Sequence, residues 1–200
     1  KMASEELQQR YPDGKGQKLG DFEVFETQLT TLRQFGEAGI IPNKDYGALA
    51  SQKCDALIVS RTSTPHAMAI GEHKQPGGIT ASNWKKLAKN LLKTKCHPTE
   101  AVIGYLYDGV STCWINGRAG DVVEVTREDG KPMPCVIDFK NKAFVSEMNY
   151  ILNNFDPIQS KIRAKSMANP DLLAKEIWQT IWRLKADRPE DCLATFVELF

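Results

Sequence analysis

The chain has 200 residues, of which 42% are hydrophobic and 26% are charged, which is typical of one globular domain with an appendage. Its formal net charge of +1 excludes a chain that is polybasic throughout, so any nucleic-acid-binding surface has to be local. No apolar run approaches the length of a membrane span, and the polar, acidic start does not look like a secretory signal, so a cytoplasmic location is expected.

The cysteines do not indicate a disulfide framework or a zinc site. Their number is odd, and no two of them have the C-x-x-C spacing of a metal-binding or redox pair. Cys96 and His97 are adjacent, but no further ligands follow at zinc-binding spacing. Reduced thiols, as in a cytosolic protein, are therefore expected at Cys54, Cys96, Cys113, Cys135 and Cys192.

The N-terminal part predicts a loose segment, a helix and then strands. Residues 1–20 contain turn-forming Pro, Asp and Gly and are expected to be flexible. Residues 21 to about 34 predict a helix, for which Asp21 is a candidate cap, because apolar residues recur there at helical spacing. Extended apolar runs then predict strands at about 46–50, 54–60 and 66–74.

The C-terminal part begins with a mixed pattern and becomes helical. A helix is predicted at about 82–93, followed by two strands, at about 101–107 and 110–115, joined by the turn Asp108-Gly109. A further hairpin is expected between residues 122–126 and 135–139. Helical character is expected from about 141, with its strongest apolar stripe at residues 172–185.

Two acidic positions stand out because each lies at the end of an apolar run. Asp55 opens the run 54–60, and Glu72-His73-Lys74 closes the run 66–74. In a strand Glu72 and Lys74 point to the same face, and a short return loop would bring Asp55 alongside them. Carboxylates bind hard divalent cations, and a lysine stabilises phosphate charge. The spacing therefore favours a metal-dependent phosphodiesterase site over a solvated Glu–Lys pair at a strand end.

This pattern resembles the active-site motif of the PD-(D/E)xK nuclease superfamily, with Asp55 as the first acid and Glu72-His73-Lys74 as E-x-K. The chain departs from the motif before Asp55, where Cys54 stands in place of proline. The resemblance covers roughly residues 20–116, whose expected order of helix, three strands, helix and strand matches the superfamily core. It implies an α/β fold with a central mixed sheet flanked by helices, followed here by a C-terminal helical segment.

The same resemblance implies the chemistry and its cofactor. Asp55, Glu72 and the backbone carbonyl of His73 would bind Mg²⁺, for which Mn²⁺ can substitute, and Lys74 would act on the attacking water or the phosphate. The His73 side chain is expected on the opposite face. Glu26, which flanks the apolar face of the predicted helix 21–34, and Gln75, which follows Lys74, are candidate helpers.

Lysines gather in the predicted helix after this motif. From Lys74 to Thr99 the chain has six lysines and no acidic residue. Such a strip either contacts the phosphates of double-stranded DNA or is a solvated face that keeps the chain soluble. The candidates for backbone contacts are Lys85, Lys86, Lys89 and Lys93.

Residues 21–140 are expected to form the endonuclease-like domain, and residues 141–200 a helical linker at the start of a following domain. The tail 174–200 resembles the helical segment that opens N6-adenine DNA methyltransferases, and the first part is similar to the nuclease domain of type I restriction R subunits. Together they imply a restriction-modification polypeptide with methylase and target-recognition parts elsewhere. S-adenosylmethionine would be needed only if a methylase domain follows Phe200, and dimerisation is one way to cut both strands.

Two other interpretations stay open. The chain could be an inactive nuclease-fold module that docks DNA or a partner chain, using the same strands and lysines. It could also be a methyltransferase fragment with an N-terminal interaction domain, although no glycine-rich cofactor loop or Asn/Asp-Pro-Pro-aromatic motif occurs. No P-loop occurs, and the three histidines accompany no nucleophile elbow.

Overall fold

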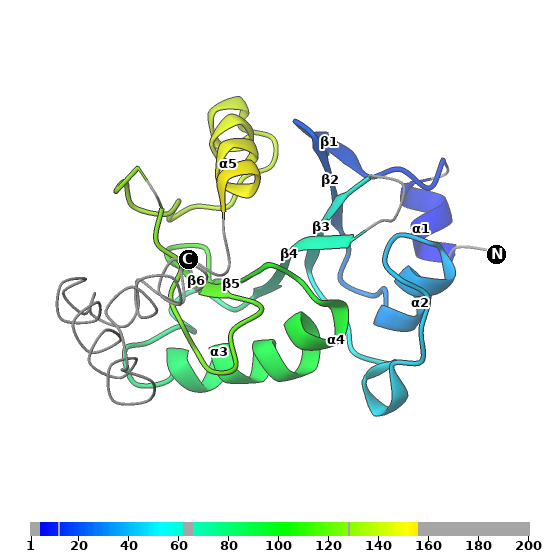
Figure 1. The fold of residues 1–200 in the computed structure, drawn as a ribbon, viewed down its shortest axis with the longest axis horizontal. Helices are drawn as coiled ribbons and strands as arrows, with labels where there is room; N and C mark the ends of the chain where they lie inside the picture. Colours follow the sequence, from blue (N-terminus) through cyan, green and yellow to red (C-terminus); the bar gives the residue numbers. More distant parts are fainter. Residues whose placement is uncertain (1–4, 12, 62–65, 128, 156–200) are drawn as a thin grey trace, which may run out of the picture. The chain divides into compact units, whose positions relative to one another are not determined.

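The structure is a computed structural model that describes residues 5–11, 13–61, 66–127 and 129–155. Over these residues six strands form one sheet in the order β1-β2-β3-β4-β5-β6, with helices beside it (Figure 1). The β4–β5 pair is parallel, and the other four pairs are antiparallel. The described residues thus have the expected α/β architecture, a mixed sheet flanked by helices.

The strands are β1 (Gln17–Leu19), β2 (Phe22–Glu26), β3 (Ala56–Ser60), β4 (His66–His73), β5 (Ile103–Tyr107) and β6 (Thr112–Asn116). The helices are α1 (Glu5–Arg10), α2 (Leu32–Glu37), the 3₁₀ turn η1 (Gly47–Leu49), α3 (Trp84–Leu91), the π-helical turn η2 (Leu92–Cys96), α4 (His97–Thr99) and α5 (Lys142–Asn154). The strands predicted around Asp55, Glu72, Tyr105 and Trp114 are confirmed, with shifts at their ends.

The helix predicted at 21–34 is wrong. Residues 22–26 form the strand β2, which pairs with β1 and β3, and α2 begins only after Thr31. The aromatic and β-branched residues of Phe-Glu-Val-Phe favour a strand that is covered on both faces. Thr31 then begins the helix with a capping box, since its side chain accepts from the Gln34 N–H and the Gln34 side chain accepts from the Thr31 N–H.

The N-terminal segment predicted to be loose contains ordered elements. Helix α1 buries Leu7, and Tyr11 directly after it is also buried, while β1 extends the sheet beyond β2. The hydroxyl of Tyr11 accepts a hydrogen bond from the Glu26 N–H at 3.1 Å, which ties this segment to the end of β2. The turn-forming residues of this segment therefore connect α1 to β1 within the fold.

Two other secondary-structure predictions need correction, and the helix expected from about 141 is confirmed over its described part. The strand predicted at 46–50 is the 3₁₀ turn η1, which Gly47 enters with a φ of +54° that other residues rarely adopt. The hairpin between 122–126 and 135–139 does not form; Glu124 makes a single bridge to Ile115 instead. The helix expected from 141 is α5, which Asn141 caps through its side chain, whereas the stripe at 172–185 lies outside the described residues.

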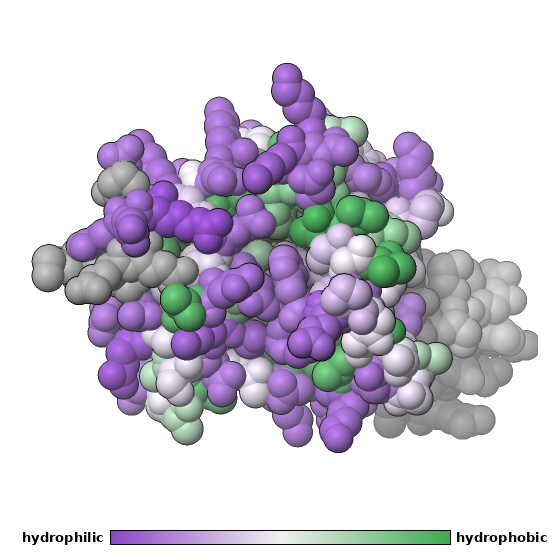
Figure 2. All heavy atoms as spheres, turned by 180° about the vertical axis from the view of Figure 1, so that it is seen from behind, coloured by the Kyte–Doolittle hydropathy of each residue, from purple (hydrophilic) through white to green (hydrophobic). Residues whose placement is uncertain are grey.

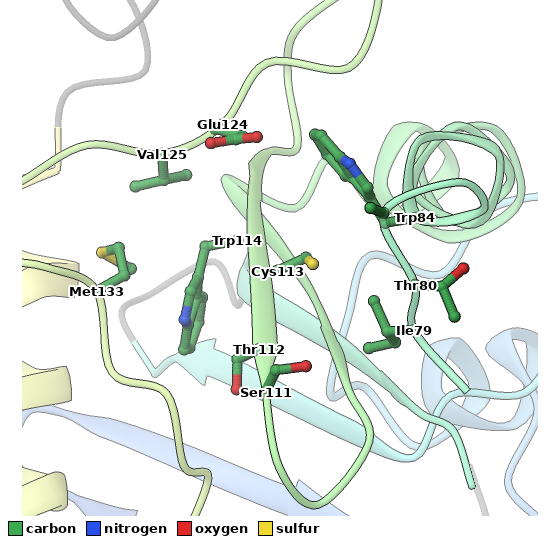
Figure 3. Close-up of a pocket in the computed structure, with 11 residues that line it drawn as sticks. Ile79, Thr80, Trp84, Ser111, Thr112, Cys113, Trp114, Glu124, Val125 and Met133 are labelled. Atoms are coloured by element: carbon green, nitrogen blue, oxygen red, sulfur yellow. The ribbon is translucent and has the colours of Figure 1, made fainter. Parts of the chain in front are cut away.

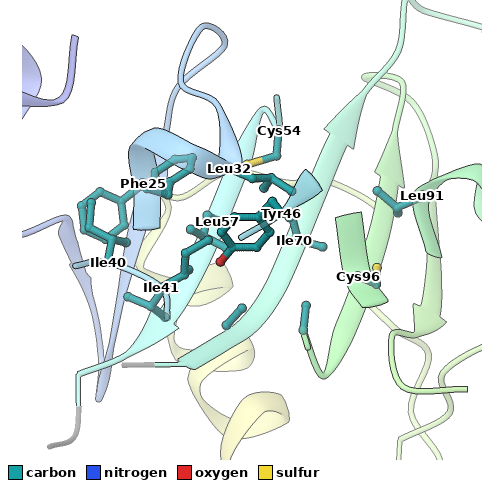
Figure 4. Packing of buried hydrophobic residues seen from close by; sticks show 14 of the residues in the cluster. Phe25, Leu32, Ile40, Ile41, Tyr46, Cys54, Leu57, Ile70, Leu91 and Cys96 are labelled. Atoms are coloured by element: carbon teal, nitrogen blue, oxygen red, sulfur yellow. The ribbon is translucent and has the colours of Figure 1, made fainter. Parts of the chain in front are cut away.

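Buried side chains form two clusters, one on each face of the sheet. The first includes Phe25, Leu57 and Ile70 and extends under α2 and α3 (Figure 4). The second includes Ile58 and Tyr105 and is joined by α5, which lies against β1. Burial on both faces explains the nearly continuous apolar runs of β3 and β5.

The connection from β4 to β5 packs a helix along one face of the sheet. Parallel strands require such a crossover, and here α3, η2 and α4 form it. Seen from behind, polar side chains cover most of the surface, and apolar side chains are exposed in a few separate places (Figure 2). Among the described residues, no helix is long and apolar enough to cross a membrane.

Candidate active site

Strand pairing places Asp55 and Glu72 side by side on one face of the sheet. Ala56 pairs with Gly71, and Asp55 and Glu72 are each the next residue beyond that pair. Side chains alternate along a strand, so both carboxylates share the face of Leu57 and Ile70, which belong to the first cluster. The two acids predicted from the sequence are therefore brought together at the end of β4.

Of the two acids, Glu72 accepts hydrogen bonds from two lysine side chains. Its Oε1 accepts a hydrogen bond from Lys74, two residues further along the chain. Its Oε2 accepts one from the Lys95 ammonium at 2.7 Å. Lys95 belongs to the π-helical turn η2, and only 6% of it is exposed. One carboxylate thus bridges a lysine from the strand and a lysine from the crossover.

This environment keeps Glu72 ionised. Burial alone would raise the pKa of the Glu72 carboxyl, because a charged group is less stable away from water. Hydrogen bonds and the positive charges of Lys74 and Lys95 outweigh that effect and hold the pKa below its ordinary value. The site therefore contains a half-buried, fully charged carboxylate between two cations.

Asp55 is held by the backbone of the neighbouring strand. Its Oδ2 accepts a hydrogen bond from the His73 N–H at 2.6 Å, and its own carbonyl accepts one from the Thr27 N–H at 3.0 Å. The adjacent Cys54 is fully buried, and burial raises the pKa of its thiol to about 12. The Cys54 thiol is therefore kept protonated near neutral pH.

Lys95 is a residue of the candidate site that sequence reasoning did not single out, since it was counted only among the lysines of the strip. A signal was present, however. Ala88, Leu91 and Lys95 recur at helical spacing, so the lysine occupies a position of the buried stripe. Fully buried lysines are rare unless they are paired, and π-helical turns are frequent at functional sites.

The His73 side chain lies on the opposite face, as predicted. Its ring is 6.0 Å from that of Tyr105 and 5.6 Å from that of Tyr107, centroid to centroid. His73 Nε2 and the Tyr105 hydroxyl are both buried, and neither has a hydrogen-bond partner within the described part of the chain. Burial, and next the charge of Glu26, raises the pKa of Tyr105 well above its ordinary value.

The two predicted helpers do not join the acids. Glu26 closes β2 and pairs with Ala56, so alternation places its side chain with Phe22 and Val24 on the face opposite to Asp55. Its assignment rested on the helix that the structure replaces with a strand. Gln75 is exposed, and its carbonyl accepts from the Gly78 N–H at 2.8 Å, which turns the chain after β4.

The lysine strip is exposed along α3 and η2. Lys85, Lys86, Lys89 and Lys93 all point to solvent, in contrast to Lys95. The Lys85 ammonium lies 5.6 Å from the centre of the Trp84 ring, and Lys89 is 3.7 Å from the exposed Asp121 carboxylate. Neither arrangement neutralises the strip, so it remains available to an anionic partner.

Asp55 and Glu72 can hold a hard divalent cation only if a main-chain oxygen contributes as a further ligand. Within the described ranges, no three His, Cys, Asp or Glu side chains are grouped so that they could hold a metal ion. Asp55 and Glu72 supply carboxylate oxygens on one face, which is the donor type that Mg²⁺ prefers. A carbonyl such as that of His73, together with water, would have to complete the coordination shell.

Comparisons with known proteins found no match for the chain. No protein-family model matches the chain, and neither a curated protein nor a solved structure is significantly similar to it.

Proposed function

We propose that this chain carries a metal-dependent nuclease site that hydrolyses phosphodiester bonds of double-stranded DNA. The observation that supports the proposal is the meeting of Asp55, Glu72 and Lys74 at neighbouring strand ends on one face of the sheet. Two acids and an ammonium at such a point can bind a cation and a phosphate together. The sequence of residues 174–200, which resembles the segment that opens N6-adenine DNA methyltransferases, favours placing the site in a restriction-modification polypeptide, with methylase and target-recognition parts as its partners.

Each side chain has a distinct task in this proposal. Asp55 and Glu72, with the His73 carbonyl, would hold Mg²⁺, which lowers the pKa of bound water and neutralises phosphate charge. Lys74 is partly exposed and reaches the phosphate. Lys95 is a positioning residue, because it is buried and fixes the second oxygen of Glu72.

The exposed lysines extend this site to a binding surface. Lys85, Lys86, Lys89 and Lys93 follow the crossover that begins next to Lys74. They contact backbone phosphates and so position the duplex without reading its sequence. Salt should therefore weaken binding, since each phosphate contact releases counterions.

The test is cleavage of plasmid DNA in Mg²⁺ or Mn²⁺ by the wild type, Asp55→Asn and Lys74→Met. Asparagine can still accept the hydrogen bond from the His73 N–H, and methionine replaces the four-atom stem of the lysine without its ammonium, so both variants should fold. Glu37→Gln, which changes an exposed carboxylate on α2, is the matched control.

We expect the control to cleave like the wild type and both site variants to lose cleavage. The unfolding midpoint of each variant has to stay close to that of the wild type for this comparison. Equal cleavage by Asp55→Asn and the wild type would exclude the site, and would point to another site or to a contaminating nuclease.

One observation favours a second function, an inactive docking module that uses the same fold. Glu72 is satisfied by two lysines and Asp55 by a backbone N–H, so the cluster is stable without a cation. DNA binding by the lysine strip together with absence of cleavage and of Mn²⁺ binding in the wild type would support this alternative.

A further inference from the structure

A cavity of about 460 Å³ opens at β6, at the edge of the sheet (Figure 3). Three segments line it. Ile79, Thr80 and Trp84 come from the loop after β4 and the start of α3. Residues 111–114 come from the turn before β6 and from β6 itself, and Glu124 and Met133 belong to the chain that follows. In the close-up, Trp84 and Trp114 lie on either side of Cys113, with Glu124 above them (Figure 3).

The strand register places this cavity near the proposed nuclease site. Glu72 pairs with Leu106, and Leu106 pairs with Cys113, so the three residues form one row across β4, β5 and β6. Neighbouring strands are about 4.8 Å apart, which puts the backbone of Cys113 roughly 10 Å from that of Glu72. Leu106 and Cys113 pack with the first cluster, so the row lies on the face of Glu72.

Hydrogen bonds hold the walls of the cavity in place. The Asp108 carboxylate accepts from the Ile79 N–H at 3.2 Å and from the Ser111 N–H at 2.9 Å, which joins two sides of the cavity. The Trp114 indole N–H donates to the Pro134 carbonyl at 2.7 Å and fixes a third side. The shape of the cavity is therefore set before any ligand binds.

The lining combines an aromatic face and a carboxylate, and a cation lies next to the aromatic face. Trp84 is partly exposed, and the Lys85 ammonium lies 5.6 Å from its ring centre. Glu124 is exposed on the rim and close to Cys113, whose pKa is raised by burial and then by the charges of Glu124 and Asp108. A nucleotide matches these features, because a base stacks on tryptophan and its phosphate attracts a lysine.

The carboxylate adds a preference among bases. An ionised glutamate only accepts hydrogen bonds, and it pairs with the amino group of cytosine or adenine. Thymine has no amino group. A base inside a duplex cannot reach such a cavity without leaving its stack, so the ligand has to be unpaired or extruded.

We propose that this cavity binds one unstacked nucleobase of the bound DNA strand, stacked on Trp84 and with its amino group donating to Glu124. The identification of the strand as the one being cut rests on the proposed function. Base binding itself does not, since it involves neither Asp55 nor a metal ion.

The experiment measures binding of labelled single strands of dA, dC or dT to the full chain by fluorescence anisotropy, in EDTA so that no cleavage occurs. We expect dA and dC to bind the wild type about tenfold more tightly than dT, the size of one hydrogen bond to a charged group. Glu124→Ala should reduce the affinity for dA and dC to the affinity for dT. Glu100→Ala, which removes another exposed carboxylate, should keep the preference.

Stacking is tested separately at Trp84. Trp84→Ala should weaken binding of all three strands roughly tenfold, and Trp84→Phe should restore most of it, because phenylalanine keeps an aromatic face. Thermal unfolding of both variants separates a binding defect from a folding defect. Equal affinity of the wild type for dA, dC and dT, or a preference that survives Glu124→Ala, would overturn the proposal.

Asp55→Asn distinguishes failure of this inference from failure of the nuclease proposal. If no cleavage occurs in the wild type while the base preference is present in both proteins, the nuclease proposal fails and the base site stands. If the wild type cleaves and shows no base preference, the nuclease site stands and the base site fails.

Discussion

Lys95 and Lys89 belong to the same helical crossover and differ in almost every physical respect. Lys95 is 6% exposed and donates to Glu72 at 2.7 Å. Lys89 is exposed, and its nearest acid, Asp121, is 3.7 Å away and exposed too. Two lysines of the same crossover thus have different places: Lys95 lies inside the candidate site, and Lys89 lies on the surface.

The difference shows that burial, and not residue type, decides what a lysine does here. A buried ammonium that loses its partner, or a buried carboxylate that loses its ammonium, is costly, because water cannot replace the missing charge. An exposed ammonium is solvated in either case and contributes little to stability. Lysines of the first kind shape a site, whereas lysines of the second kind attract a distant anion.

The largest effect is expected from Lys95→Met. The change leaves Glu72 with one lysine instead of two in a half-buried position, so the free energy of unfolding should fall by about 3 kcal/mol. Urea denaturation measures this directly. Metal affinity should also change, which Mn²⁺ titration followed by electron paramagnetic resonance can detect without any cleavage assay.

A double variant tests whether Lys95 and Glu72 contribute to stability as a pair. Lys95→Met combined with Glu72→Gln removes the buried carboxylate together with its partner, so much of the lost stability should return. If the double variant is as unstable as the sum of the two single variants, Lys95 and Glu72 do not act as a pair.

The next effect concerns the exposed strip as a whole. Replacing Lys85, Lys86, Lys89 and Lys93 by glutamine should leave stability almost unchanged and weaken duplex binding strongly at low salt. Each lost phosphate contact should reduce the slope of log affinity against log salt concentration by about 0.9. Anisotropy titrations over a range of salt concentrations measure that slope, and an unchanged slope would show that the strip is only a solvated face.

The sequence predicted the structure correctly where a residue pattern fits only one type of secondary structure. Apolar runs predicted β3, β4, β5 and β6, and alternation along β4 placed Glu72 and His73 on opposite faces. The prediction was wrong where the same apolar pattern fits both a helix and a strand. Phe22 and Phe25 fit a helical stripe, but a strand buried on both faces also needs adjacent apolar residues.

The missed residues have a common physical cause. Lys95 joins Glu72 only because the crossover folds back over the sheet, a contact between residues 23 positions apart. Glu26 was misplaced because its face depends on the type of element that carries it. Such information comes from tertiary packing, which local periodicity does not contain.

A smaller effect, which depends on pH, is expected at Asp108, whose carboxylate holds the loop after β4 to the turn before β6. The Ser111 N–H, and after it those of Val110 and Ile79, outweigh burial and lower the pKa of Asp108 from 3.8. Its contribution to stability is therefore complete above pH 3.8 and is lost as the pH falls through the lower folded-state value. Asp108→Asn should lower the unfolding midpoint at pH 7, with a difference that narrows as the solution is acidified. A difference that is constant with pH would show that charge is unimportant at this turn.

The smallest effect is expected from Lys89→Met, the matched partner of Lys95→Met. Its ion pair with Asp121 is exposed on both sides, so its loss should leave the free energy of unfolding almost unchanged. The same substitution in the same helical crossover would then give two very different results by urea denaturation, because only one of the two ammonium groups has been removed from water. Equal destabilisation by both variants would mean that the methionine side chain, and not the lost charge, is responsible, and the distinction between a site lysine and a surface lysine would no longer hold for this crossover.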